Sequence, residues 1–395
     1  MPAVAGPGNR GGGGDPVIGR RLGAGASAPG PAMLVSVVAC SGRELAALEA
    51  DPSWQLGDLL VAVPKPEGAA GHWLRIFFGE TELCGVATLG EIGVQGGSEL
   101  TLVVTRSRRM VTCHGHEAKI WAADSGECLR TLIGHEGYVT SAVLSADGQQ
   151  ALTASCDRTA KVWGASSGEC LRTLVGHRGR VTSAALSMDG QRALTAAWDG
   201  TARVWGINSG ECLRTLVGHH GHVTSASFSV DGQQVLTASS DSTAKVWAAS
   251  SGECLRTLEG HHGHVWSAVF SVDGQQVLTA SSDSTAKVWA ADSGDCLRTL
   301  VGHQDSVTSA VFSPDGQRVL TASWDATANV WAADSGECLR TLVGHLGRVT
   351  SAVFSADGQQ ALTASLDRTA KLWAADSGEC LRTLRRAGNK ACFAP

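Results

Sequence analysis

One unit of 42 residues recurs along most of this 395-residue chain, and it constrains the fold more than any other feature. The copy from His303 to Gly344, printed with the preceding Gly302, reads GHQDSVTSAVFSPDGQRVLTASWDATANVWAADSGECLRTLVG, and steps of 42 residues give nearly the same line. The repeated tryptophan occurs at Trp121, Trp163, Trp205, Trp247, Trp289, Trp331 and Trp373. A period of this length indicates a repeat architecture in which each copy is one supersecondary unit.

Each copy alternates strand patterns with turn residues. VTSAVFS and QVLTAS flank an Asp-Gly pair, which is a strong hairpin signal. ATANVWA and ECLRTLVG follow, separated by Ser-Gly, so one copy supplies four short strands. A single small sheet cannot bury both faces, whereas a ring of sheets can. The sequence therefore predicts a mainly β protein with a seven-bladed β-propeller, one blade per repeated tryptophan.

The residues at fixed places in the repeat resemble the WD-repeat (WD40) family over residues 109–395. The family pattern has Gly-His before the first strand, Asp in the turn before the third strand and Trp near its end; the Asp that usually follows the Trp is Ala or Gly here. The resemblance implies a hydrogen-bonded tetrad of His, Thr, Asp and Trp in each complete blade. The implied tetrads are His135/Thr153/Asp157/Trp163, His177/Thr195/Asp199/Trp205, His219/Thr237/Asp241/Trp247, His261/Thr279/Asp283/Trp289, His303/Thr321/Asp325/Trp331 and His345/Thr363/Asp367/Trp373.

Threonine, histidine and aspartate together are also the components of a hydrolase triad. A catalytic triad occurs once in an enzyme, whereas this set recurs in six copies at the same spacing. A buried network that satisfies its own polar groups explains the repetition better. We therefore predict no catalytic residue, no cofactor and no enzymatic activity.

Composition narrows the classes of partner and the cellular compartment. The net charge of −5 favours neither nucleic acid nor acidic membrane, and no apolar run has the length of a membrane span. Seven of the twelve cysteines recur at the 42-residue period, on the predicted outer strand. We expect these cysteines to be small buried apolar residues, too far apart to form disulfides, in a cytoplasmic or nuclear protein.

The residues before the repeats divide into a tail and a small domain. Residues 1–32 are rich in Gly, Pro and Ala and are predicted to be disordered. Residues 33–105 show two strands, a helix expected from Asp51 to Val63, and two further strands, LRIFF and ELTLVV. This α+β order resembles the ubiquitin-like β-grasp family, most clearly in RIFFGETEL, TLGEIGV and GSELTLVV.

The departures from the ubiquitin-like pattern leave two interpretations open. ELTLVV continues into the repeats without a terminal Gly-Gly, so the resemblance does not imply conjugation to other proteins. The patch that ubiquitin receptors bind would map to Ile76 and Val103. The domain is predicted to be either a small docking module or an element that engages the ubiquitin–proteasome pathway.

The first copy of the repeat lacks its first strand. RMVTC and AKIW, from Arg109 onward, match the second and third strands of a blade. At the other end of the chain, AGNKACFAP resembles a shortened first-strand segment. We expect this C-terminal segment to complete the first blade; the alternative donor is ELTLVV.

Since the repeats are near-copies, the places where they differ are candidates for function. After the histidine the copies carry Glu136, Arg178, His220, His262, Gln304 and Leu346. Two residues later they carry Tyr138, Arg180, His222, His264, Ser306 and Arg348. Before the turn aspartate they carry Cys156, Trp198, Ser240, Ser282, Trp324 and Leu366, and Trp266 replaces a threonine of the first strand.

In this fold these loops open on one face, around the mouth of the central channel. Aromatic and arginine side chains are common anchors of protein interfaces, so we predict partner binding. The predicted contact residues are Tyr138, Arg178, Arg180, Trp198, Trp266, Trp324 and Arg348. Drift after duplication is the alternative explanation of this variation.

The sequence thus predicts a non-enzymatic interaction scaffold, a monomer or part of a hetero-complex, that binds acidic or amphipathic peptides or proteins. One alternative is a substrate receptor or adaptor in a ubiquitin–proteasome pathway. Another is a metal-binding propeller that uses a cluster of imidazoles. The members of that cluster are His220, His222, His262 and His264.

Overall fold

The computed structural model divides the chain into two compact units, residues 1–105 and 106–395. The residues that the structure describes are 33–39, 44–55, 58, 59, 62, 63, 72–78, 81, 82, 88–95, 98–106, 109–122 and 126–385. Each unit is considered by itself.

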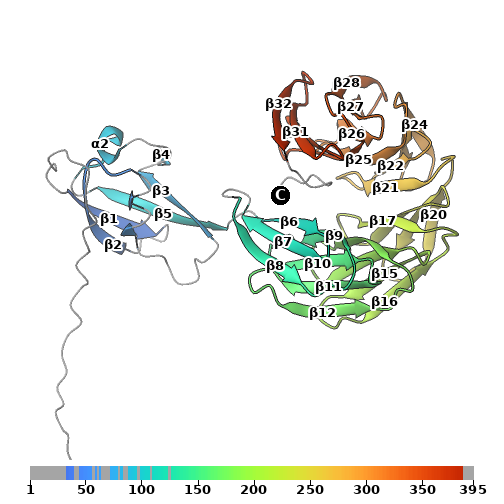
Figure 1. Cartoon of the computed structure of the whole chain (residues 1–395), viewed down its shortest axis with the longest axis horizontal. Helices are drawn as coiled ribbons and strands as arrows, with labels where there is room; N and C mark the ends of the chain where they lie inside the picture. The colour runs from blue at the N-terminus through green and yellow to red at the C-terminus, as the bar shows by residue number, and fades with distance from the viewer. Residues whose placement is uncertain are drawn as a thin grey trace, which may run out of the picture. The chain divides into compact units, whose positions relative to one another are not determined.

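The N-terminal unit is built on one mixed sheet of five strands (Figure 1). Its strands are β1 (Met33–Ala39), β2 (Glu44–Ala50), β3 (His72–Phe78), β4 (Thr81–Glu82) and β5 (Glu99–Arg106), and helix α2 is Leu89–Ile92. They lie in the order β2-β1-β5-β3-β4, with β1 antiparallel to β2 and parallel to β5. Val35, Val37, Leu59, Leu89 and Leu100 form its buried core.

Two expectations for this unit are wrong. The helix does not begin at Asp51, because the Asp51 carboxylate accepts the Ser53 amide (2.8 Å) and closes a turn there, while Gln55 forms a bridge with Thr88. Within the segment from Asp51 to Val63, the described residues in helical conformation are 58, 59 and 62. Ile76 is 0 % exposed in the core, since it lies on the inner face of β3, so it does not belong to a receptor-binding patch.

The second unit consists of repeated antiparallel sheets, as the 42-residue period predicts. Its described residues form six four-stranded sheets and one three-stranded sheet. The three-stranded sheet contains β6 (Arg109–His114), β7 (Glu117–Ala122) and β8 (Cys128–Ile133). The next three sheets contain β9 (Val139–Leu144), β10 (Gln150–Ser155), β11 (Thr159–Gly164), β12 (Cys170–Val175), β13 (Val181–Leu186), β14 (Arg192–Ala197), β15 (Thr201–Gly206), β16 (Cys212–Val217), β17 (Val223–Phe228), β18 (Gln234–Ser239), β19 (Ala244–Ala248) and β20 (Cys254–Leu258). The last three contain β21 (Val265–Phe270), β22 (Gln276–Ser281), β23 (Thr285–Ala290), β24 (Cys296–Val301), β25 (Val307–Phe312), β26 (Arg318–Ser323), β27 (Thr327–Ala332), β28 (Cys338–Val343), β29 (Val349–Phe354), β30 (Gln360–Ser365), β31 (Thr369–Ala374) and β32 (Cys380–Arg385).

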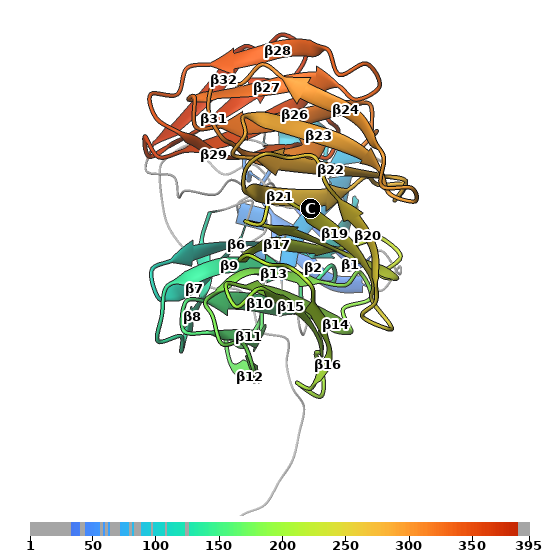
Figure 2. The ribbon, with the colours of Figure 1, turned by 90° about the vertical axis from the view of Figure 1, so that its right-hand side faces the viewer.

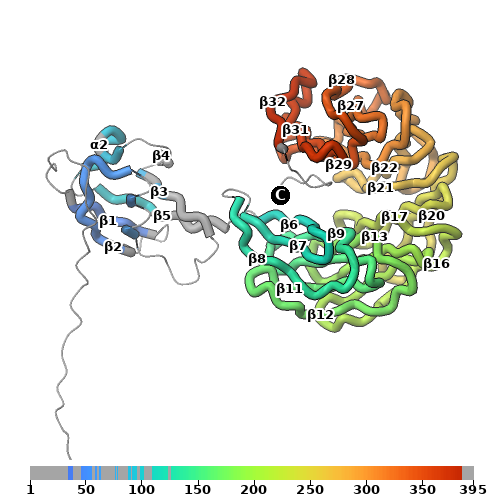
Figure 3. The backbone as a smooth tube through the Cα atoms, viewed as in Figure 1, coloured from blue at the N-terminus to red at the C-terminus, as the bar shows by residue number. Residues whose placement is uncertain are grey.

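Successive sheets stand side by side, with their first strands adjacent: β9 contacts β13, β13 contacts β17, and the series continues to β29 (Figures 1, 2 and 3). The second strand of a four-stranded sheet is buried on both faces. Its sequence alternates Ala with Leu or Val, and the small Ala side chains let neighbouring sheets pack closely against it. Each core cluster therefore lies between two sheets; one joins Leu152 and Val162 to Val181 and Trp205 of the next sheet. The predicted fold class, mainly β with repeated four-stranded antiparallel sheets, is confirmed.

Two kinds of side-chain hydrogen bond recur between successive sheets. On the first strand a threonine hydroxyl donates to a valine carbonyl of the following sheet, as Thr140 does to Val181 (2.6 Å). On the last strand an arginine Nε donates to a turn carbonyl of the following sheet, as Arg130 does to Ser166 (2.7 Å). The same arginine contact recurs at Arg172, Arg214, Arg256, Arg298 and Arg340. The sequence analysis overlooked this arginine, although it recurs in every copy.

The repeated cysteines do not behave as expected. They are free thiols and exposed, because the fourth strand buries little besides its leucine, such as Leu174 in β12. Each sulfur contacts main-chain and threonine oxygens of its own strand; Cys212 Sγ lies 3.4 Å from the Arg214 carbonyl oxygen. The prediction that they are buried apolar residues is wrong. The exposed cysteines are Cys128, Cys170, Cys212, Cys254, Cys296, Cys338 and Cys380.

The three-stranded sheet has the second, third and fourth strand positions of the repeat, and no described strand fills its first position. The proposed C-terminal donor, residues 388–395, lies outside the described residues. The alternative donor ELTLVV is excluded, because β5 is a central strand of the N-terminal sheet, between β1 and β3.

Deletion of Gly388 to Pro395 tests the closure of the ring. If this segment supplies the missing strand, its loss exposes the edges of neighbouring strands. We expect a lower melting temperature, and aggregation measured by light scattering. A soluble monomer with the melting temperature of the parent chain would show that closure does not need this segment.

Candidate functional site

A buried network of side chains joins the strands within each four-stranded sheet. In one of them His219 Nδ1 lies 2.8 Å from Asp241 Oδ2, and His219 Nε2 lies 2.8 Å from Thr237 Oγ1. Trp247 Nε1 donates to the same threonine oxygen at 2.8 Å. Because the carboxylate only accepts, Nδ1 carries the proton, so the Thr237 hydroxyl donates to Nε2 and accepts from the indole. Every polar group of the four residues thus has a partner.

The other five predicted sets have the same arrangement, with His–Asp distances between 2.7 and 3.0 Å and Trp–Thr distances of 2.8 Å. A fifth residue that the sequence analysis missed completes each network. Thr243 donates its amide (3.0 Å) and hydroxyl (2.7 Å) to Asp241 Oδ1. A threonine two residues after the aspartate recurs in all six copies, so the signal was present.

The network threonines were predicted from the sequence to belong to structural tetrads, and the structure places them in the core, where no substrate or partner reaches them. Thr237 is 0 % exposed, and so is its counterpart in each of the other five sets. Each of these five hydroxyl oxygens lies 2.7 or 2.8 Å from Nε2 of its histidine. A nucleophile must meet its substrate, so the alternative of a hydrolase triad disagrees with the structure, and the role of these threonines is structural. The five counterparts are Thr153, Thr195, Thr279, Thr321 and Thr363.

The network fixes the charge state of its members. Burial lowers the pKa of His219, against the opposing hydrogen bond and charge of Asp241. Burial alone would raise the pKa of Asp241, but hydrogen bonds from Thr243 and His219 outweigh it and lower that pKa to about 2. At neutral pH the histidine is therefore neutral with both nitrogens occupied, and the aspartate is ionised. This state suits a structural network rather than proton transfer.

The variable loop positions are brought together at one end of the sheets, by main-chain pairing inside each repeat. The Trp198 amide donates to the Arg180 carbonyl (2.9 Å), and the Trp324 amide donates to the Ser306 carbonyl (2.9 Å). The loop before the first strand therefore lies against the turn between the second and third strands. We refer to this end of the second unit, with the two stacks described next, as the loop face.

The first stack joins two neighbouring sheets. The Arg180 guanidinium lies 5.0 Å from the centroid of the Trp198 ring. On the same tryptophan, the His222 ring stacks at 4.9 Å with an interplanar angle of 22°, and His222 Nδ1 lies 2.6 Å from the Trp198 carbonyl oxygen. Trp198 remains 44 % exposed, so an aromatic surface with a cation beside it is open to a partner.

The second stack runs across the loops of three successive sheets. The rings of His264 and Trp266 are 5.8 Å apart, and those of Trp266 and Trp324 are 6.2 Å apart. The Arg348 guanidinium lies 4.2 Å from the centroid of Trp324, close enough for a cation–π contact. Both tryptophans are half-buried and Arg348 is exposed.

Trp266 destabilises its immediate surroundings. Its indole Nε1 is buried without a hydrogen-bond partner among the described residues. At the equivalent position of other repeats, Thr140 and Thr308 donate a hydrogen bond to a carbonyl of the next sheet. The indole of Trp266 on β21 does not make this bond. An unsatisfied buried donor costs about 1–3 kcal/mol. Among the described residues, Arg203 and Asn329, which replace a lysine of the repeat, also leave a buried polar atom without a hydrogen-bond partner.

Two of the predicted contact residues lie outside the stacks. Tyr138 is 64 % exposed and packs against His116, with ring centroids 4.7 Å apart. Arg178 is exposed, and its amide donates to Asp199. The sequence analysis did not assign His116, His222 or His264 to the interface, because stacking partners in adjacent sheets depend on the three-dimensional arrangement.

The proposed metal cluster does not form. Within residues 126–385, and in the other described parts of the chain, no three His, Cys, Asp or Glu side chains converge to hold a metal ion. Instead His222 and His264 each direct Nδ1 to a main-chain carbonyl of the preceding repeat, at 2.6 and 2.8 Å. The interpretation of these histidines as metal ligands is therefore withdrawn.

Substitutions in the network test its structural role. Asp241→Ala leaves the His219 nitrogen and the Thr243 donors unsatisfied and is expected to lower the free energy of unfolding by about 1–3 kcal/mol. Trp247→Ala leaves a cavity and is expected to cost about 3–5 kcal/mol. Urea denaturation measures both, with the exposed Glu253→Ala, expected to stay within about 0.5 kcal/mol, as the control. If the Asp241→Ala protein is as stable as this control, the network does not stabilise the fold.

The shifted pKa values also predict how stability depends on pH. The folded pKa of the network histidines is below the ordinary 6.5, so the unfolded chain binds protons first, and stability falls as pH decreases below about 6.5. The aspartates, with pKa values lowered from 3.8 to about 2, add a second loss below about pH 4. Thermal melts at pH 8, 7, 5 and 3 measure this dependence. A melting temperature that rises between pH 7 and pH 5 would contradict it.

The described part of the chain contains no helix long and apolar enough to cross a membrane. No curated protein matches the chain. Two family models do match: the WD domain, G-beta repeat, over residues 126–164 and 168–206, and the IFT122 first beta-propeller, over residues 222–394. With the repeated sheets described above, these matches show that the chain belongs to the WD-repeat β-propeller family, whose members serve in general as protein–protein interaction scaffolds.

Proposed function

We propose that the protein is a non-enzymatic scaffold whose loop face binds an acidic or amphipathic segment of a partner protein. The observation that carries this proposal is the pair of stacks, in which Trp198 and Trp324 each lie beside an arginine. The network histidines and aspartates, which resemble catalytic groups in type, are occupied by one another in every complete copy.

The chemistry of the stacks fits a ligand with both apolar and acidic groups. A guanidinium that lies over an indole keeps its N–H edges available to carboxylates, while the ring beside it offers apolar area. Arg180 and Arg348 are exposed and Trp198 is nearly half exposed, so both components are accessible at one end of the sheets. Aromatic and arginine side chains are also the residues that most often dominate binding energy at interfaces.

The place of Trp266 in the second stack supports function over drift. Its buried indole lacks a hydrogen-bond partner among the described residues, yet its ring links His264 to Trp324 and so extends the second stack. Residues that lower stability while completing a surface feature are characteristic of functional sites.

For the N-terminal unit we propose a ubiquitin-like docking module. The order β2-β1-β5-β3-β4 with parallel β1 and β5 supports this likeness. Participation in a ubiquitin–proteasome pathway is the second candidate function, and it rests on this topology, because Ile76 is buried and does not supply a receptor contact. A cytoplasmic or nuclear location belongs to the same proposal and is supported by the seven repeat cysteines, which are exposed free thiols.

Substitution of the two stacked tryptophans tests the loop face. Trp198→Ser and Trp324→Ser introduce serine, the residue found at the equivalent positions of two other repeats, Ser240 and Ser282. Each is expected to weaken binding by about 1–2 kcal/mol, roughly a factor of 5 to 30, with little change in melting temperature. The affinity of each variant is measured on an array of acidic amphipathic peptides and their charge-reversed counterparts.

The matched control is Leu366→Ser, since Leu366 has the same place in the repeat and is 47 % exposed. It should leave peptide binding unchanged. If the double variant of Trp198 and Trp324 binds acidic peptides as tightly as the parent chain, the loop face is not the binding surface.

A further inference from the structure

At the opposite end of the sheets, where each second strand begins, arginines close some of the junctions between neighbouring repeats. Arg318, at the start of β26, donates to the Gly358 carbonyl (2.7 Å) and to Asp376 Oδ1 (2.6 Å), and its guanidinium lies 5.6 Å from the Phe354 ring. Arg192, at the start of β14, donates to the Gly232 carbonyl in the same way (2.7 Å). A carbonyl, a carboxylate and an aromatic ring thus form a guanidinium site that the chain fills from its own sequence.

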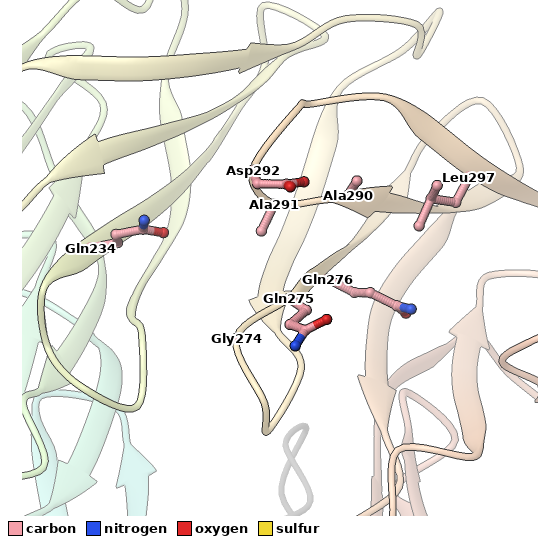
Figure 4. Close-up of a pocket in the computed structure, with 8 residues that line it drawn as sticks. All are labelled: Gln234, Gly274, Gln275, Gln276, Ala290, Ala291, Asp292 and Leu297. Carbon is pink, nitrogen blue, oxygen red and sulfur yellow. The ribbon is translucent and has the colours of Figure 1, made fainter.

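The same acceptors recur without the arginine two repeats before Arg318. A shift of 84 residues replaces Arg318 by Gln234, Gly358 by Gly274 and Asp376 by Asp292. The structure has a pocket of about 370 Å³ at this junction (Figure 4). Its lining includes Gln234, Gly274, Gln275, Gln276, Asp292 and Leu297.

The turn glycines have different neighbours at the junctions. A Cβ atom added to Gly232 would lie 2.6 Å from Arg192 Nη2, and one added to Gly358 would lie 3.4 Å from Arg318 Nη2. A third junction is closed by Arg109, whose Nη1 donates to the Gly148 carbonyl (3.0 Å). At Gly274 a Cβ atom would meet nothing within 4 Å among the described residues, as at Gly148, but here the pocket lies beside the glycine in place of an arginine.

The acceptors of the open junction are held in place. The Ser293 amide donates to Asp292 Oδ1 (2.7 Å), which favours one orientation of the carboxylate. The Gly274 carbonyl belongs to a turn closed by the bond from the Gly274 amide to the Ser271 carbonyl (2.9 Å). A ligand that enters the pocket meets two acceptors whose positions are set before it binds.

We propose that this pocket binds an arginine side chain of a partner protein. The guanidinium would donate to the Gly274 carbonyl and to Asp292, as Arg318 does to their counterparts. A guanidinium suits two acceptors in different directions because its N–H groups are fixed in one plane, whereas an ammonium is a compact point charge. The site lies at the other end of the strands from the loop face, so it is a second and independent contact surface.

The chain offers a matched set of variants for the test. Gln234→Arg supplies the arginine that Arg192 and Arg318 provide elsewhere and should fill the pocket. Gln150→Arg makes the same change at a junction where Asn208 stands in place of the carboxylate, and should leave the pocket open. Asp292→Ser introduces the residue found at Ser166 and Ser250, and the exposure of Asp292 favours unaltered folding.

The probe is the capped tripeptide Gly-Arg-Gly, with Gly-Lys-Gly as its control, titrated into the full chain and followed by amide chemical shifts in NMR. We expect saturable shifts at Gly274, Gln275 and Asp292, lost in Gln234→Arg and retained in Gln150→Arg. Asp292→Ser should weaken binding by about two- to fivefold, as expected for loss of an exposed ion pair. Absence of these shifts, equal binding of the lysine peptide, or unchanged binding by both Gln234→Arg and Asp292→Ser would overturn the proposal.

Discussion

The fold depends on one hydroxyl group in each complete repeat. Thr237 lies on the second strand of its sheet, accepts a hydrogen bond from Trp247 on the third strand, and donates one to His219 in the loop before the first strand. Through His219 it reaches Asp241 in the turn between the second and third strands. One buried oxygen therefore connects two strands, a loop and a turn. A residue with only a donor or only an acceptor at this place would leave the indole or the imidazole unsatisfied.

The network itself was predicted from the resemblance to the WD-repeat family, and the period placed its members at fixed positions in six copies. Contacts between side chains of neighbouring sheets were harder to predict from the sequence. The contacts of His222 with Trp198 and of Arg348 with Trp324 require the spatial order of the repeats. The burial of the cysteines was misjudged, because an apolar residue on a fourth strand has no further sheet to cover it. The helix expected from Asp51 begins later, since the Asp51 side chain closes a turn instead.

The two ends of the sheets have acquired different chemistry by the same route. The strands are committed to the core and vary little, so substitutions accumulate in loops and at strand ends. At one end, some copies carry large aromatic and cationic side chains where others carry small ones, and these large side chains form the stacks around Trp198 and Trp324. At the other end, the pocket arises from a smaller residue, since Gln234 stands where Arg192 and Arg318 close equivalent junctions. The repeat therefore offers both protruding and recessed surfaces without a change in its backbone.

The hydrogen bonds between sheets have a consequence for how the chain folds. The threonine-to-valine bonds span 41 residues and the arginine-to-turn bonds span 36, so each repeat is tied to the next one along the chain. Contacts of such limited sequence separation can form in succession, with a modest entropic cost for each loop that closes. A chain that emerges gradually during synthesis could thus add one sheet at a time to a growing stack. The similarity of the repeats also creates a hazard, because the open edge of an unfinished stack is complementary to any later copy, and an out-of-order contact would resemble the correct one.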